Sequence, residues 1–213
     1  MFDLLQKELR LAVHPSMYIF VCLGALVLIP AYPYGVVFFF AMLGIFQSMM
    51  YARETRDIYF TALLPVRKRD AVKAKLLLAS FAQLTQLLLS VPFAFLRTLY
   101  LPEGNPVGIE ANAAYYGFGL MIFGIFNLVF FTQFFKTAYK AGVAFLTALI
   151  PCTLCIFAME ASVHFPGLGW LDGTDGASLA RQAPILLAGI AVYAGTWYWT
   201  FRAASKRFEQ VDL

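Results

Sequence analysis

Long apolar stretches separated by short charged gaps run through almost all of this 213-residue chain. Hydrophobic residues make up 61% of it and charged residues 13%, against roughly 25% charged residues in soluble domains. Apolar runs of this length suit the hydrocarbon of a bilayer, where a chain satisfies its own backbone by forming helices. The sequence therefore predicts an all-α, polytopic membrane protein.

Six stretches are long enough, or nearly so, to cross the hydrocarbon, which takes about 20 apolar residues in a helix. The first is short, and Pro30 and Pro33 after it favour a tight hairpin with the second. This span then either thins the bilayer locally or takes in flanking residues. The predicted spans are residues 16–29, 34–52, 71–96, 113–135, 138–161 and 183–201. We expect one transmembrane domain over 1–213, with spans 1–2 in 16–52, spans 3–4 in 71–135 and spans 5–6 in 136–201.

The basic residues give the orientation. Of the sixteen Lys and Arg residues, all except Arg97 and Arg181 fall on one side of the predicted spans, which predicts both termini in the cytoplasm. The net charge of +4 reflects this topology, so no nucleic-acid partner is expected. Residues 1–15 repeat apolar side chains at a helical period, which predicts an interfacial helix. An outer loop at 160–182 and a cytoplasmic tail at 202–213 complete the layout.

The loop between spans two and three, RETRDIYFTALLPVRKRD at 53–70, contains an apolar block between charged groups. Residues 58–64 are too few to cross the bilayer and too apolar to stand free in water. Two surfaces can cover them, the bilayer interface or the groove of a cytoplasmic partner protein. Pro65 is expected to end a short helix at Leu64, and Asp70 to serve as the N-cap of the next helix.

This loop resembles the first cytoplasmic loop of ABC-2 type permeases, in the small six-span class found with peptide-export and bacteriocin-immunity ATPases. The run LLPVRKRDAVKAKLL departs from that pattern at Arg67, where serine is usual. The amphipathic start, the six spans and the charged tail are similar as well. The positions in step with the family pattern are Glu54, Leu64, Pro65, Val66, Lys68, Asp70, Val72 and Lys75.

The resemblance implies the permease half of an ATP-driven exporter, whose first cytoplasmic loop forms a coupling helix seated in an ATPase. No P-loop sequence occurs in the chain, so ATP and Mg²⁺ are expected on a separate ATPase, and neither a cofactor nor enzymatic activity is expected here. The expected coupling residues are Glu54, Asp57, Ile58, Tyr59, Phe60, Leu63, Leu64, Pro65, Arg67, Lys68 and Arg69.

The resemblance also implies a dimer, with itself or with a sister permease, in a bacterial plasma membrane. It favours export of an amphipathic or antimicrobial peptide, with lipid or drug efflux as the next class. It further favours a re-entrant helix in the outer loop at 160–182. The alternative function is an ATP-independent transporter or a membrane-embedded enzyme, which needs intramembrane charges or a converging polar site.

Polar residues inside the spans have two interpretations. Gln83, Gln86 and Ser90 share one face of span three, and Asn127 lies in span four. Side chains of this kind bridge helices, or they line a path for a polar or amphipathic substrate. Near the outer end, Arg97 and Glu160 form a candidate ion pair, or each side chain reaches the headgroup layer alone.

Cys152 and Cys155 form a Cys-x-x-Cys motif within span five. No other Cys or His lies near it to complete a four-ligand site, so these thiols are expected to pack as apolar side chains. The two histidines, His14 and His164, fall on opposite sides of the membrane. No metal site is therefore expected.

Overall fold

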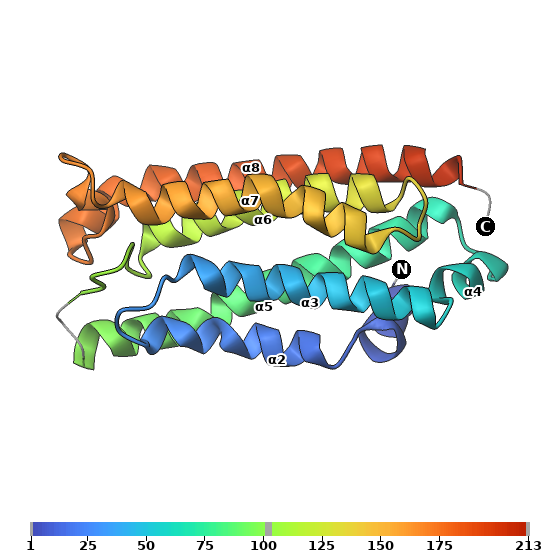
Figure 1. The fold of residues 1–213 in the computed structure, drawn as a ribbon, viewed down its shortest axis with the longest axis horizontal. Coiled ribbons are helices and arrows are strands. Elements are labelled where there is room, and N and C mark those ends of the chain that lie inside the picture. Colours follow the sequence, from blue (N-terminus) through green and yellow to red (C-terminus); the bar gives the residue numbers. More distant parts are fainter. Residues whose placement is uncertain (1, 101–103, 212–213) are drawn as a thin grey trace.

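A computed structural model describes residues 2–100 and 104–211, and within these ranges the chain is helical with no strand. The helices form an elongated bundle in two layers (Figure 1). Residues 212–213 of the predicted tail lie outside the described part. In chain order the elements are α1 (Phe2–Lys7), the π-helical turn η1 (Glu8–Ala12), α2 (Ser16–Cys22), the 3₁₀ helix η2 (Leu23–Leu28), α3 (Gly35–Glu54), α4 (Asp57–Leu63), α5 (Lys68–Tyr100), α6 (Ala113–Phe134), α7 (Ala141–Ser162), the 3₁₀ turn η3 (Gly169–Leu171) and α8 (Gly176–Glu209).

Five of the described helices, α3, α5, α6, α7 and α8, are long and apolar enough to cross a membrane. The segments 3–12 and 16–28 meet at 97° and make a sixth span when they are counted together. The prediction of an all-α polytopic membrane protein is therefore confirmed.

The first predicted span is only partly α-helical. After α2 the chain tightens into η2, and the two elements together rise about 22 Å, less than the hydrocarbon thickness of about 30 Å. The carbonyl of Phe20 accepts a hydrogen bond from Gln86 Nε2 of α5, 2.9 Å away. Span one is thus short, as its sequence predicts, and it is hydrogen-bonded to α5.

The last helix is longer than predicted at both ends. It takes in residues 176–182 of the predicted outer loop and most of the predicted tail, because its helical pattern continues past the apolar stretch. Between α7 and α8 the structure has the single 3₁₀ turn η3. The expectation of a re-entrant helix in this loop, which came from the resemblance, is therefore wrong. Asp175 caps α8 by accepting from the backbone N–H groups of Ala177 and Ser178.

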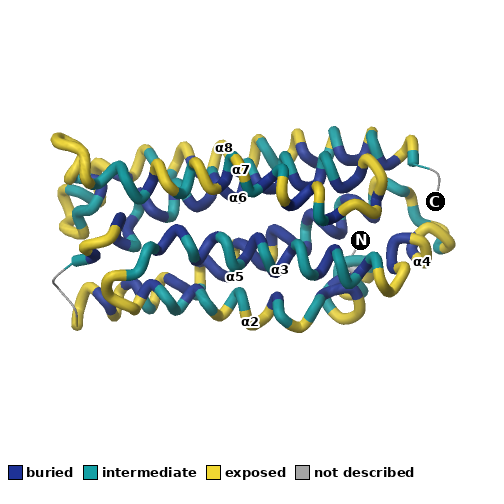
Figure 2. Tube along the Cα trace, in the orientation of Figure 1, coloured by how far each residue is buried: buried dark blue, intermediate teal, exposed yellow. Residues whose placement is uncertain are grey.

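Helix α6 lies behind α7 in Figure 1 and packs against both α7 and α8. Its phenylalanines fill the core, and Phe123, Phe126 and Phe130 are fully buried. A side chain on Gly189 of α8 would overlap the carbonyl of Gly117, so these glycines let α6 and α8 approach closely. Figure 2 shows burial along the facing sides of the helices and exposure on their outer sides.

The two ends of the bundle differ in what they contain. Helices α1 and α4 and the end of α8 share one end, which is called the inner end below (Figure 1). The opposite, outer end holds the loops at 104–112 and 163–175. This arrangement agrees with the predicted clustering of basic loops on one side of the membrane.

Candidate functional site at the inner end of the bundle

Helix α4 is the short helix predicted from the apolar block before Pro65. It follows Arg56, which turns the chain in a left-handed conformation with φ of 54°, and it ends at Leu63 with Leu64 extended. The expected N-cap of α5 is wrong, because α5 begins at Lys68 and Asp70 lies inside its first turn. The backbone N–H of Asp70 donates to the carbonyl of Arg67 instead.

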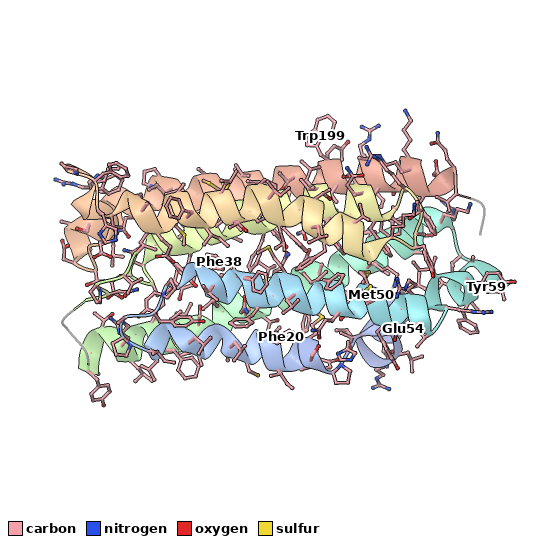
Figure 3. The ribbon with its side chains drawn as sticks, viewed as in Figure 1. Phe20, Phe38, Met50, Glu54, Tyr59 and Trp199 are labelled. Carbon is pink, nitrogen blue, oxygen red and sulfur yellow. The ribbon has the colours of Figure 1, made fainter. Side chains whose placement is uncertain are left out.

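The two faces of α4 have opposite environments. Asp57, Ile58 and Thr61 are buried against the bundle. On the other face Tyr59, Phe60 and Leu63 are exposed by 52%, 57% and 69%. Figure 3 shows Tyr59 pointing away from the end of the bundle. An apolar face this exposed marks a surface for another molecule.

Four charged side chains, three of them buried, hold the inner face of α4. The Nζ atom of Lys75 lies 2.9 Å from Asp57 Oδ2 and 3.0 Å from Glu8 Oε2. The Nζ atom of Lys7 lies 2.6 Å from Asp57 Oδ1 and 2.9 Å from Glu8 Oε1, and it also donates to Thr61 Oγ1. Each cation thus bridges both carboxylates. We call these four residues the inner charge cluster.

The inner charge cluster is electrically neutral and almost closed to water. The side chains of Lys75 and Glu8 are 2% exposed and that of Asp57 is 8% exposed. Burial alone raises the pKa of Asp57, but Lys75 and Lys7 outweigh it and hold that pKa below its usual value. Moving one member of this cluster away would leave a buried charge without its partner, which is costly. The cluster therefore holds η1, α4 and the first turns of α5 together.

The basic residues after Pro65 are only partly free. Lys68 donates to the carbonyl of Val211 at 2.7 Å and lies over the ring of Phe208, so it ties the start of α5 to the end of α8. Arg69 makes an exposed pair with Glu209 at 3.5 Å. Arg67 is exposed and has no ion pair within the described ranges.

A hollow of about 450 Å³ flanks α4 on the side of α3. Glu54 and Tyr59 line it together with Tyr139 of the α6–α7 loop. Leu64 and Pro65 line a second hollow of about 490 Å³ beside α1. All eleven predicted coupling residues thus lie at one end of the bundle, in α4 or next to it.

The polar residues of the spans bridge helices. Gln83 and Asn127 are fully buried and exchange two amide hydrogen bonds at 3.0 and 2.9 Å. Tyr193 of α8 donates to Gln83 Oε1, which joins a third helix. Gln86 donates to Phe20 of span one, and the hydroxyl of Ser90 lies 3.1 Å from that of Tyr116. In this conformation these side chains connect helices, and their role in a substrate path stays a prediction.

The predicted outer ion pair is wrong. Arg97 pairs with Glu110, with Nη2 at 3.1 Å from Oε1 and Nε at 3.2 Å from Oε2. Glu160 instead accepts hydrogen bonds from the backbone N–H groups of Gly35 and Ile109. Its carboxylate is thus satisfied at the start of α3, where a helix N-terminus favours negative charge.

The cysteine motif takes part in packing. Cys152 is buried with its Sγ 3.8 Å from the carbonyl of Ile122, and Cys155 is partly buried. Across residues 2–100 and 104–211, no group of three or more His, Cys, Asp and Glu side chains is placed to hold a metal ion.

Sequence reasoning missed the role of Lys7, Glu8 and Lys75. Lys75 carries a signal that points to it, because it lies inside the predicted span 71–96, where a charge needs a partner. The partners are 18 and 67 residues away in the chain, so spacing alone does not identify them.

Comparison with protein families matches the chain over residues 3–199 to the family described as ABC-2 family transporter protein. The chain belongs to this family and is a membrane permease component of an ABC transporter. Permeases of this family are generally non-catalytic membrane subunits, and the family implies association with an ABC ATPase. Searches of curated proteins and of solved structures gave no match.

Proposed function

We propose that this permease works in an exporter and that α4 binds a separate cytoplasmic ATPase, passing on the movement driven by ATP hydrolysis. The division of α4 into two faces supports this proposal. Its inner face is tied to the bundle by Asp57, whereas Tyr59, Phe60 and Leu63 stand exposed at the inner end. Exposed apolar anchors on a short helix suit a hydrophobic groove of a partner protein.

The inner charge cluster transmits the movement of α4 to α5 and to the interfacial helix. When the ATPase pushes on the exposed face of α4, the contact from Asp57 to Lys75 moves the foot of α5. The contact from Asp57 to Lys7 moves the interfacial helix at the same time. Because the cluster is buried and already paired, water does not replace its contacts, and the three elements move as one unit.

The proposal places α4 and both chain ends in the cytoplasm of a bacterial cell, with the permease in the plasma membrane. ATP and Mg²⁺ are bound by the ATPase. Two permeases, identical or sister chains, pair and bind two ATPase copies. The substrate moves outward and is amphipathic, an antimicrobial peptide being the class that the sequence resemblance favours. The excess of basic residues at the inner end supports this orientation.

The test compares two leucines with equal exposure. Leu63 of α4 is 69% exposed and Leu11 of the interfacial segment is 68% exposed, both at the inner end. We expect Leu63→Asp to lower the amount of ATPase that co-purifies with the permease by at least about tenfold, or about 1.4 kcal/mol. Leu11→Asp is expected to retain the ATPase, with size-exclusion chromatography reporting that both variants fold.

Retention of the ATPase by Leu63→Asp at the level of the unchanged protein would show that α4 is not the docking element. Loss of the ATPase in both variants would assign the effect to the membrane attachment of the permease rather than to α4.

A further inference from the structure

At the outer end of the bundle, α5 diverges from α6 and α8 (Figure 1). The space between them is a hollow of about 600 Å³, within the range of small-molecule sites. Its wall is mostly apolar, with Val91, Phe95 and Leu99 on the α5 side and Leu179 and Leu186 on the α8 side. Such a hollow accepts a hydrocarbon chain.

A smaller polar hollow of about 150 Å³ adjoins the apolar one, and both are lined by Thr98 and Thr174. Three charged residues line it, Arg97, Glu110 and Asp172. The two hollows therefore form one amphipathic site, with a long apolar part and a short charged part.

The charges of the polar part do not cancel. Arg97 is paired with Glu110, and Asp172 has no cation within ion-pair distance among the described residues. Its Oδ1 atom accepts the backbone N–H of Glu110 at 2.7 Å. Arg97 is 1% exposed, and its Nη1 finds no hydrogen-bond acceptor in the described part of the chain. The carboxylate without an ion-pair partner and the cationic donor without an acceptor thus belong to two residues that line the same hollow.

We propose that these adjoining hollows bind a zwitterionic phospholipid of the outer leaflet whose headgroup has an ammonium and a phosphate. The ammonium pairs with Asp172, a phosphate oxygen lies on the side of Arg97, and one acyl chain fills the apolar hollow between α5 and α8. An anionic headgroup suits the site less well, because it adds a negative charge beside an acid that already lacks a partner.

The site lies at the opposite end of the molecule from α4, so binding is measured on the permease alone and does not depend on the ATPase. The probes are dioleoyl phosphatidylethanolamine and dioleoyl phosphatidylglycerol, which have the same chains and differ in headgroup charge. Titration of the purified protein in detergent, followed by native mass spectrometry, gives the bound fraction of each lipid. We expect the ethanolamine lipid to bind about tenfold more tightly, a difference of about 1.4 kcal/mol.

Two pairs of variants test the two parts of the site. Asp172→Asn removes the surplus charge and keeps an oxygen for the Glu110 N–H, and Asp175→Asn is its control in the same loop, outside both hollows. Val91→Trp fills the apolar hollow, and Leu88→Trp is its control, one turn away on α5, also exposed, but outside both hollows. Asp172→Asn and Val91→Trp are each expected to lower ethanolamine-lipid binding about tenfold, and the controls to leave it unchanged.

Equal binding of the two lipids by the unchanged protein overturns the proposal, and so does unchanged binding in Asp172→Asn or Val91→Trp. If Val91→Trp converts a dimer to a monomer while lipid binding stays the same, the hollow is occupied by a second copy of the chain and the proposal is wrong. Size-exclusion chromatography measures this together with the folding of each variant.

Discussion

The two ends of the bundle each hold a small group of charges, and the groups differ in balance and closure. The inner charge cluster has two cations and two acids in alternation, and its best-buried members are 2% exposed. Among the described residues the outer group has one cation, Arg97, for two acids, Glu110 and Asp172, and it borders an open hollow. A buried, neutral group of charges is suited to holding helices together, whereas an accessible group with excess charge is suited to binding a ligand.

The largest expected effect breaks the closed group. Lys75→Met leaves Glu8 and Asp57 sharing Lys7 alone, and removal of one partner from a buried pair costs about 3 kcal/mol or more. The melting temperature of the purified protein measures this loss. Lys73→Met on the same helix, where no ion pair is present within the described residues, is expected to change stability by less than about 0.5 kcal/mol.

A smaller effect is expected at the outer end. Arg97→Met deprives Glu110 of its charge-assisted hydrogen bonds from Arg97. The expected cost is only about 2 kcal/mol, because the adjoining hollow gives the freed carboxylate access to water. Arg181→Met changes the other outer basic residue, which is exposed, and is expected to be nearly neutral. If Arg97→Met lowers the melting temperature more than Lys75→Met does, the distinction between closed and open groups fails.

The smallest effect concerns pH and has opposite signs at the two ends. Lys75 and Lys7 lower the pKa of Asp57 despite its burial, so its stabilising contribution is complete above about pH 4 and is lost as the pH falls through its folded value. Burial, with Glu110 nearby, raises the pKa of Asp172. Its ionised form therefore destabilises the fold as the pH rises above about 4.

Melting temperatures between about pH 3 and pH 8, in detergent without added lipid, check both signs. At neutral pH, Asp172→Asn is expected to raise the melting temperature by about 1 °C, and this gain disappears below about pH 4. Asp57→Asn is expected to lower it at neutral pH, with the difference shrinking in acid. A gain in stability from Asp57→Asn at neutral pH would contradict the assignment of the inner cluster.

The sequence predicted the helices and not the pairing of their charges. Apolar runs set the ends of α6 to within a residue, because the edge of the hydrocarbon decides where such a helix begins and ends. Helix α4 was found because an apolar block before Pro65 needs a cover. Depth alone paired Arg97 with Glu160, yet Glu110 lies at the same end. Several acids lie at the same depth, and helix packing decides which of them pairs with Arg97. The hydrophobic pattern of the sequence does not contain this information.

Helix α8 connects the two ends of the molecule as a single rod. Its 34 residues span about 51 Å, well beyond the hydrocarbon thickness of about 30 Å. Near its outer end Gln182 donates to the carbonyls of Trp170 and Gly173, and just past its inner end the carbonyl of Val211 accepts from Lys68. Pro184 is the single proline in this helix, so bending concentrates there. A displacement at the inner end, near Lys68, would therefore be carried to the outer end by this one helix, in which Pro184 is the most easily bent position.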